Sequence, residues 1–329
     1  MEKLKIGVIG TGHLGNFHIK LLKEIENCEL VGIFDKDTTK AAEAAKSNQV
    51  KVFENLEELL ANVSCVSIVT STTAHYDIAK ICLSLGKHVF VEKPITSEIW
   101  QADELVKIAK EQNIKLQVGH IERFNPALLS LDKYNLDPKF IQSDRLAQFN
   151  PRGIDVAVVH DLMIHDIDII LSLVKSEVKD VHASGVAVVS DNIDIANARI
   201  EFENGAVANV TASRISQKKM RKMRMFQRDA YITLDFTTGT SEIYRLVKPD
   251  EYDKSKSISF GIMGVGENQK AVIYEQPEQK EVNALRYELQ LFIDSILENK
   301  NPVVSGEDGL KALIVADLII KKIEESKLK

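Results

Sequence analysis

Residues 6–15, IGVIGTGHLG, decide the fold class of this chain of 329 residues. An apolar run, residues 6–9, leads directly into three glycines with the spacing G-x-G-x-x-G, and a helical pattern follows. A second apolar run, residues 30–34, ends at Asp35, twenty residues after the third glycine. A strand, a glycine turn, a helix, a second strand and an acid in this order are typical of the βαβ unit that binds a dinucleotide.

Each glycine of this motif has its own physical task. Gly10 permits the tight turn between strand and helix, Gly12 lets the backbone approach a pyrophosphate, and Gly15 lets the helix pack on the strand. The helix that begins with His13 and Leu14 then directs its N-terminal N–H groups at the anion. The alternative is that the glycines only form a turn, but the adjoining strand, helix and acid favour a cofactor site.

Asp35 indicates which dinucleotide the motif would take. Its carboxylate would accept the ribose hydroxyls and would repel a 2′-phosphate. We therefore expect NAD rather than NADP as the cofactor, although the neighbouring Lys36 weakens this preference.

Short apolar runs alternate with helical periodicity over the first 120 residues. Strands are expected near residues 4–9, 30–34, 65–70, 88–91 and 115–118, and helices near 14–26, 38–47, 55–61, 75–85 and 97–112. This alternation predicts an α/β Rossmann domain, in which helices cover both faces of a parallel sheet. We assign residues 1–121 to this NAD-binding domain.

The pattern changes after about residue 135, where alternation of period two predominates. A helix near 160–174 precedes expected strands near 178–189, 194–203, 206–213 and 229–236, with a hairpin turn at Asn204-Gly205; helices near 283–298 and 307–325 follow. Residues 122–329 are therefore expected to form an α+β domain with an open, mostly antiparallel sheet, for substrate binding and oligomerisation. Residues 248–270 form a polar, glycine-bearing stretch that we interpret as a loop without an assigned role.

Composition limits the classes of protein that remain. An apolar content of 44% with 27% charged residues is ordinary for a globular protein, and a net charge of −6 argues against nucleic acid as a partner. Cys28, Cys65 and Cys82 are odd in number and lack CxxC spacing, so neither a disulfide framework nor a zinc site is indicated. The first strand begins by Leu4 and no apolar run is long enough to span a bilayer. We expect a cytoplasmic protein without a membrane partner.

Glu92-Lys93-Pro94 ends the expected strand near 88–91, at the carboxyl edge of the parallel sheet, where open α/β folds bind their ligands. Proline biases the preceding lysine towards an extended backbone, which helps to direct its side chain. An ammonium group at this edge can polarise a hydroxyl or stabilise a developing alkoxide. The alternative is a surface lysine at the end of a strand.

A second polar cluster lies on the expected helix 160–174. Asp161, His165, Asp168 and Ser172 form one stripe of this helix, opposite the apolar stripe of Met163, Ile167, Ile170, Leu171 and Val174. Asp161 and His165 stand one turn apart, and a histidine oriented by a carboxylate is a suitable base for a hydroxyl proton. A solvated helix face is one alternative. A metal site is the other, but His160 and His165 lie on different faces, so no metal is expected.

Together these residues resemble the glucose–fructose oxidoreductase/inositol dehydrogenase (Gfo/Idh/MocA) family. The likeness covers the glycine turn, Glu92-Lys93-Pro94 and the Asp161/His165 pair, in that order along the chain. It implies an NAD(P)-dependent dehydrogenase that acts on CH–OH groups, with Lys93, Asp161 and His165 as the catalytic residues. Glu92 and Lys93 would also border the cofactor.

Two segments, residues 119–126 (GHIERFNP) and 161–168 (DLMIHDID), look most like family members that act on nucleotide sugars, particularly UDP-N-acetylglucosamine 3-dehydrogenases. The likeness implies that the sugar 3-hydroxyl is oxidised. Arg123 and Asn125 would lie near the sugar or diphosphate, together with Lys93 and His165. Alternatively, Arg123 pairs with an acid, and Asn125 shapes a turn before Pro126.

Further residues are weaker candidates. Arg214 and the basic run 218–224 (KKMRKMR) could neutralise a diphosphate, but a solvated loop or a subunit contact would explain that run equally well. Thr70 and His75 lie in TSTTAH, which resembles the family segment beside the cofactor. Ser71 departs from that segment, where a proline often stands.

The predicted chemistry is hydride transfer from a sugar carbon to NAD, in which His165 takes the hydroxyl proton, Asp161 orients His165 and Lys93 polarises the oxygen. Lys93 and His165 could exchange these roles. The alternatives are a dehydrogenase of an unactivated sugar or inositol, an imine or tetrapyrrole reductase, and a non-catalytic NAD-binding regulatory protein. The open sheet face predicts a homodimer or homotetramer, since an exposed face is usually covered by another copy.

Overall fold

The computed structural model describes residues 3–150, 156–252 and 257–327. The chain divides into two compact units, residues 1–121 with 283–314, and residues 122–282 with 315–329. Part of the stretch 248–270, residues 253–256, lies outside the described residues. Among the described helices, none is long and apolar enough to cross a membrane.

The first unit contains a parallel sheet of five strands in the order β2-β1-β3-β4-β5. The strands are β1 (Leu4–Ile9), β2 (Cys28–Phe34), β3 (Cys65–Ile68), β4 (His88–Glu92) and β5 (Leu116–Gly119). They match the five strands expected from the apolar runs. The order reverses direction between β1 and β3, and such a switch point opens a crevice at the carboxyl ends of the strands.

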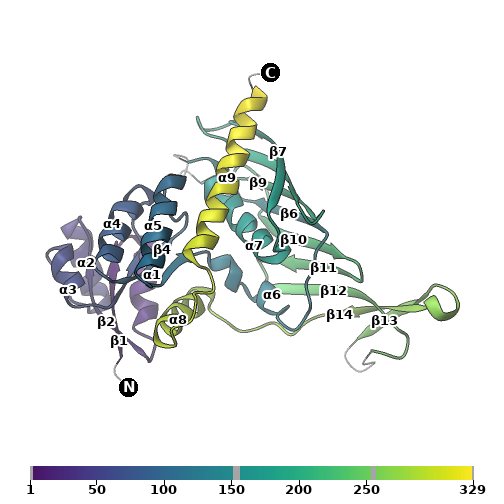
Figure 1. Cartoon of the computed structure of the whole chain (residues 1–329), viewed down its shortest axis with the longest axis horizontal. Coiled ribbons are helices and arrows are strands. Elements are labelled where there is room, and N and C mark those ends of the chain that lie inside the picture. Colours follow the sequence, from purple (N-terminus) through teal and green to yellow (C-terminus); the bar gives the residue numbers. More distant parts are fainter. Residues whose placement is uncertain (1–2, 151–155, 253–256, 328–329) are drawn as a thin grey trace. The chain divides into compact units, whose positions relative to one another are not determined.

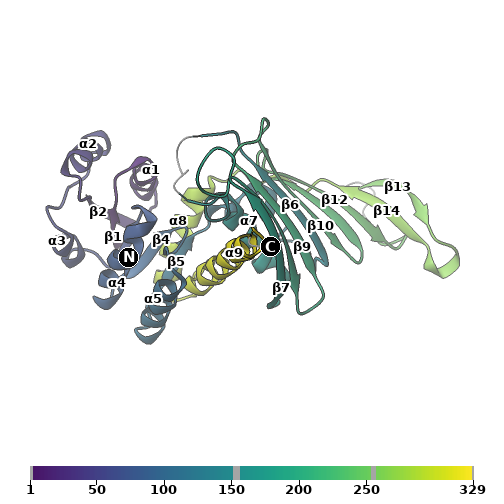
Figure 2. The same ribbon diagram turned by 90° about the horizontal axis from the view of Figure 1, so that it is seen from above.

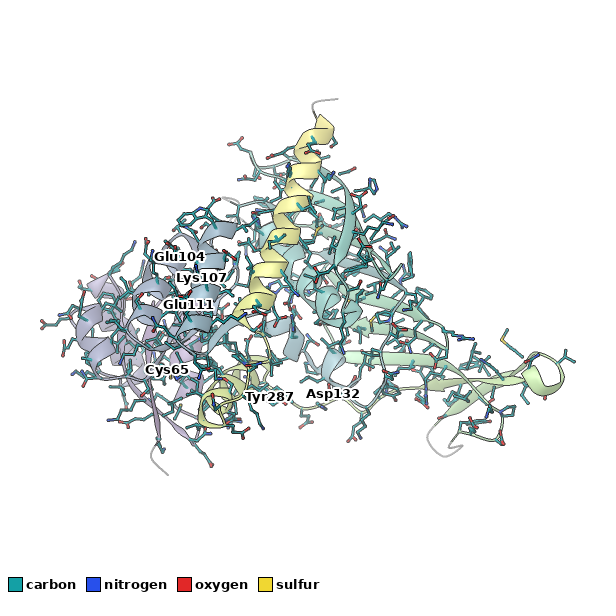
Figure 3. All side chains as sticks on the ribbon, in the orientation of Figure 1. Cys65, Glu104, Lys107, Glu111, Asp132 and Tyr287 are labelled. Atoms are coloured by element: carbon teal, nitrogen blue, oxygen red, sulfur yellow. The ribbon has the colours of Figure 1, made fainter. Side chains whose placement is uncertain are left out.

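Five helices alternate with these strands (Figure 1). They are α1 (His13–Leu22), α2 (Thr38–Asn48), α3 (Leu56–Ala61), α4 (Thr72–Ser84) and α5 (Ile99–Glu111). Each helix is amphipathic: α5 buries Ala102, Leu105 and Ala109, while Glu104, Lys107 and Glu111 extend from its other side (Figure 3). Trp100 at the start of α5 is 58% exposed and meets the Tyr76 ring edge-on, with centroids 5.1 Å apart.

Residues 283–314 belong to the first unit because α8 (Ala284–Leu297) packs on its core. Phe292 of α8 meets Phe90 of β4 edge to face, with ring centroids 5.8 Å apart. The side chain of Gln117 donates to the carbonyl of Glu288 at 3.2 Å.

Cys28, Cys65 and Cys82 are all buried free thiols of this unit; Cys65, labelled in Figure 3, lies in β3.

The second unit is built on a sheet of nine strands in the order β13-β14-β12-β11-β10-β6-β9-β8-β7. All pairs are antiparallel except β6 with β9. The strands are β6 (Phe140–Leu146), β7 (Val178–Val186), β8 (Ile195–Phe202), β9 (Val207–Ser213), β10 (Met220–Gln227), β11 (Ala230–Asp235), β12 (Thr240–Val247), β13 (Ile258–Met263) and β14 (Lys270–Glu275). The expected α+β domain with a mostly antiparallel sheet is therefore confirmed, and Gly205, at φ +80°, makes the predicted hairpin turn.

Five strands of this sheet are additional to those expected. The stretch interpreted as a polar loop contains β13 and a 3₁₀ turn, Gly266–Asn268, before β14. The basic run 218–224 lies largely in β10, where buried Met223 and Met225 alternate with exposed Lys222 and Arg224. The charged residues hid this period of two, because Lys222 and Arg224 occupy the two outward positions between Met220 and Phe226.

Helical segments cover one face of the large sheet. They are a 3₁₀ turn (Ile121–Phe124), α6 (Pro126–Leu129), a π-helical turn (Val159–Met163), α7 (Ile164–Val174) and the later part of α9 (Gly306–Lys327). Figure 2 shows α7 and this part of α9 on the same side of the sheet. On the opposite side, no described element of this unit covers the sheet. A ladder of aromatic rings crosses that open face: Phe140, Phe226, Tyr231, Tyr244, Tyr274 and Phe260.

Candidate active site

The glycine turn joins β1 to α1 by close backbone contacts. Gly10 has φ +97°, and a Cβ there would lie 2.5 Å from the carbonyl oxygen of Val69. A Cβ on Gly15 would lie 2.1 Å from the carbonyl oxygen of Gly10. Both positions therefore require glycine, and they hold the first turn of α1 against the ends of β1 and β3.

Gly12 differs from these two glycines, because a Cβ there would meet no atom within 4 Å. It borders a cavity of about 330 Å³, which is lined by residues that follow β1, β2 and β3: Gly10, Gly12, His13, Leu14, Asp35, Lys36, Lys40 and Thr70 among them. The cavity lies at the switch point of the sheet, at the N-terminus of α1. Open space beside helix N–H groups suits the pyrophosphate of a dinucleotide.

Asp35 directly follows β2 and is held by the glycine turn. One carboxylate oxygen accepts hydrogen bonds from the backbone N–H and the hydroxyl of Thr11, at 2.7 and 2.9 Å, and the other accepts from the N–H of Asp37 at 2.9 Å. These bonds fix a half-exposed anion beside the cavity. A fixed carboxylate at this place suits the ribose hydroxyls of a dinucleotide.

Thr70 and His75 occupy different environments. Thr70 borders the cavity, whereas His75 in α4 is only 1% exposed. Its Nδ1 lies 2.9 Å from the carbonyl oxygen of Pro94, and its Nε2 lies 3.3 Å from that of Thr70. Burial lowers the pKa of His75, so the ring is neutral near pH 7. It connects the loop after β3 to the turn after β4.

Lys93 follows the last residue of β4 and is half-buried. A cis peptide bond joins it to Pro94. The preceding Glu92 lies 3.1 Å, Oε1 to Nε2, from His18 of α1, whose Nδ1 lies 2.8 Å from the hydroxyl of Ser67. The turn that carries Lys93 is therefore tied to α1, β3 and α4.

In the second unit, Asp161 and His165 are half-buried at the start of the expected helix. The structure differs from a regular α-helix here, because residues 159–163 form a π-helical turn and α7 begins only at Ile164. π-Helical turns are rare in proteins, and those that occur are often found at functional sites. His160, beside Asp161, is bonded to Asp317 of α9 at 2.6 Å.

The two remaining acids of α7 are buried rather than solvated. Asp166 accepts from the hydroxyl of Ser143 at 2.7 Å and from Nε of Arg145 at 2.5 Å, and both ionic side chains are at most 3% exposed. The guanidinium of Arg145 also donates to Glu122 at 2.8 Å. These contacts join α7 to β6 and thereby fix the helix that carries His165.

Arg123 forms a forked pair with Asp168, with Nε and Nη2 each 2.7 Å from a carboxylate oxygen. The two side chains are 12% and 1% exposed. Pairing with an acid was one of the two interpretations of Arg123, and the partner lies 45 residues away in the sequence. The Arg123 side chain thus contributes to the anchoring of α7.

Asn125 and Arg214 also have partners within the second unit. Asn125 caps α6 by accepting from the N–H of Ala127 at 3.1 Å, and it donates to the carbonyl of Phe236 at 3.0 Å. Arg214 is 4% exposed and donates to the carbonyl of Val156 at 2.5 Å. Among the described residues, no three His, Cys, Asp or Glu side chains gather as metal ligands would.

Family models match most of both units. Residues 4–120 match the oxidoreductase family with an NAD-binding Rossmann fold, and residues 135–241 match the C-terminal domain of GFO/IDH/MocA proteins. The chain therefore belongs to the Gfo/Idh/MocA family of oxidoreductases, and its first unit has the NAD-binding Rossmann fold of that family.

Individual relatives cover nearly the whole chain. UDP-N-acetylglucosamine 3-dehydrogenase from Acidithiobacillus ferrooxidans is 36% identical over 96% of each chain. A solved structure of that enzyme superposes with a TM-score of 0.87 at 34% identity, covering 99% of both chains. Myo-inositol 2-dehydrogenase from Thermotoga maritima is 26% identical, over 98% of this chain and 97% of its own.

Sequence reasoning missed three residues that hold the site together. Thr11 lies inside the glycine motif as a variable position, His18 is the one polar side chain among the buried residues of α1, and Arg145 stands in a strand that we did not expect. Their partners are distant in sequence: His18 and Glu92, for example, are 74 residues apart. A buried histidine on an otherwise apolar helix face was the one available signal.

Proposed function

We propose that this chain is an NAD-dependent dehydrogenase that oxidises the 3-hydroxyl of UDP-N-acetylglucosamine, or of a related nucleotide sugar, by transferring hydride from carbon 3 to NAD. The observation that carries the substrate assignment is the likeness to the Acidithiobacillus enzyme, at 36% identity over 96% of each chain. The Asp35 cavity supports the cofactor assignment. The second unit would supply the contacts to the sugar.

NAD is preferred over NADP because Asp35 is held in place as an anion beside the cavity. The carboxylate accepts three hydrogen bonds, from Thr11 and Asp37, and therefore cannot turn away from a 2′-phosphate without breaking them. Lys36 and Lys40 also border the cavity. Lys40 pairs with Asp37 at 3.2 Å, which reduces the attraction it would offer to a phosphate.

The chain's own groups would manage the substrate hydroxyl. A bound NAD would supply the hydride acceptor. His165 takes the hydroxyl proton, Asp161 orients the imidazole, and the Lys93 ammonium stabilises the oxygen as it becomes a carbonyl. The reverse assignment makes Lys93 the base. Arg123, Asn125 and Arg214 are held by the contacts described above and are the proposed contacts of the second unit to the sugar or diphosphate.

The open face of the large sheet supports assembly with a second copy. Stacked pairs such as Phe226 with Tyr231, whose centroids are 4.7 Å apart, place exposed aromatic surface on this face. Exposed aromatic surface of this kind is typical of an interface. We propose a homodimer or homotetramer, and light scattering of wild type and Phe226→Glu tests it: smaller particles for the variant are expected, and monomers for both would contradict it.

Absorbance of the reduced nicotinamide tests the activity. The purified protein, near-stoichiometric with NAD so that one turnover is visible, is mixed separately with UDP-N-acetylglucosamine, UDP-glucose, free N-acetylglucosamine and inositol. We expect reduction with the UDP-amino sugar. Reduction by inositol or by the free sugar alone would instead favour the alternative that the Thermotoga myo-inositol 2-dehydrogenase suggests.

Two variants test the residue assignment. Lys93→Met and His165→Asn should bind NADH as wild type does, while turnover falls by about a thousandfold or more, since each removes a group that acts on the reacting oxygen. The cofactor assignment is tested by comparing turnover with NAD and turnover with NADP, in wild type and in Asp35→Ser. Normal turnover in both catalytic variants would contradict the assignment, and unchanged cofactor preference in Asp35→Ser would contradict the role of Asp35.

A further inference from the structure

The turn after β4 holds Lys93 between two residues that each contact a buried histidine. On one side, Glu92 lies 3.1 Å from Nε2 of His18. On the other side, the carbonyl oxygen of Pro94 lies 2.9 Å from Nδ1 of His75. The two histidines come from different helices, α1 and α4, and are 0% and 1% exposed.

The His18 side forms a complete hydrogen-bonded chain. With its proton on Nε2, His18 donates to the Glu92 carboxylate, and Nδ1 then accepts from the hydroxyl of Ser67 at 2.8 Å. One tautomer thus satisfies both contacts. Gly119 also adjoins the carboxylate, since a Cβ there would lie 2.9 Å from the carboxyl atoms. The Glu92 carboxylate is therefore confined by the His18 donor and by the backbone of Gly119.

The His75 side holds the backbone rather than a side chain. Because burial lowers the pKa of His75, the neutral ring carries one proton, and the shorter contact assigns that proton to Nδ1, which donates to Pro94. The Nε2 contact to Thr70 is longer, at 3.3 Å. His75 therefore fixes the residue that directly follows Lys93.

We propose that His18 and His75 are positioning residues, which hold the side chain of Glu92 and the backbone of Pro94 on either side of Lys93 and so limit where its ammonium can lie. This rests on the proposed role of Lys93. A lysine side chain has four rotatable bonds, so anchoring its backbone limits how far the charge can move. Displacement by about 1 Å at a reacting centre can lower a rate about a hundredfold.

Two pairs of variants test this positioning role of His18 and His75. His75→Leu removes both ring nitrogens, whereas His75→Asn leaves an amide donor near the position of Nδ1; His18→Leu and His18→Gln form the same contrast at Nε2. We expect each leucine variant to lower kcat about ten- to a hundredfold, while KM for the sugar and Kd for NADH change less than about twofold. The amide variants should recover most of kcat.

Because kcat follows the Lys93 ammonium, the leucine variants should also move the pH profile of kcat, which a loss of folded protein alone would not do. Gly119→Ala provides a second approach that leaves both histidines in place. Its Cβ would displace the Glu92 carboxylate, so we expect the same loss of kcat as in His18→Leu. This variant keeps the test meaningful if a leucine variant does not fold.

His88→Leu is the matched control. His88 opens β4, at the opposite end of the strand from Glu92, and its Nδ1 accepts from the N–H of Lys115 at 3.0 Å. We expect its kcat to stay at the wild-type value. The proposed positioning role is contradicted if His18→Leu, His75→Leu and Gly119→Ala lower kcat no more than His88→Leu does. If Lys93→Met itself keeps turnover, the proposed function fails first.

Discussion

The two units hold their candidate residues by different physical means. In the first unit, Lys93 stands between two residues that each contact a buried histidine ring, that of His18 or that of His75. In the second unit, α7, which carries His165, is held by the buried ion pairs Arg145–Asp166 and Arg123–Asp168. Removing one partner of a buried ion pair leaves an unpaired charge, which costs more than the loss of a neutral hydrogen bond. The second unit should therefore be more sensitive to a single substitution.

The largest effect is expected from Arg145→Met, which leaves Asp166 and Glu122 without their buried cation. The free energy of unfolding of the second unit should fall by about 3–5 kcal/mol, measured by urea denaturation. Arg199→Met is the control, since the Arg199–Glu201 pair is 44% and 36% exposed and its loss should cost about 1 kcal/mol or less. Equal losses in the two variants would remove the distinction between the units.

Substitutions in the glycine turn give a smaller effect and separate folding from binding. Gly10→Ala should lower the free energy of unfolding by about 1–3 kcal/mol, because alanine is strained at φ +97° and its Cβ would meet the Val69 carbonyl. The Cβ of Gly12→Ala would meet no atom within 4 Å. The free energy of unfolding of this variant should therefore match that of wild type, while its Kd for NADH rises. Calorimetry and fluorescence titration measure the two quantities. An equally destabilised Gly12→Ala would contradict the assignment of open space there to the cofactor.

The smallest expected effect is a difference in the pH at which the two units lose stability in acid. Burial lowers the pKa of His75 and His88, so their contribution to stability is present above the unfolded histidine pKa of about 6.5 and is lost as the pH falls through the folded values. In the second unit, burial raises the pKa of Asp194, but hydrogen bonds from Val188, Val189 and Ser190 outweigh this and hold it at about 2. That contribution is present above the unfolded pKa of about 3.9 and is lost only as the pH falls towards 2.

Hydrogen exchange between pH 7.5 and 5.5 measures this difference, after correction for intrinsic exchange. Peptides that cover residues 70–95 should lose protection, while those that cover residues 186–196 keep it. His75→Gln should flatten the loss in the first unit. Loss of protection in both sets at the same pH would mean that the two units do not respond separately to acid.

The sequence predicted the first unit better than the second because its signals are local. Gly10, Gly15 and Asp35 lie within one βαβ unit, and each is needed where the chain turns or ends a strand. Of the missed strands β6, β10, β12, β13 and β14, β10 was hidden by the charges of Lys222 and Arg224 at alternate positions, and β13 is exposed at every residue and so has no buried alternation. Arg123 could not be assigned either, because its partner, Asp168, is brought close only by the fold.

The single tryptophan of the chain, Trp100, gives the two units separate optical signals. It lies in α5 beside Tyr76, so its emission reports on the first unit. The ladder tyrosines Tyr231, Tyr244 and Tyr274 belong to the second unit, and neighbouring aromatic rings held in fixed geometry give near-ultraviolet dichroism. One unfolding experiment, recorded by both signals, therefore follows each unit without any added label.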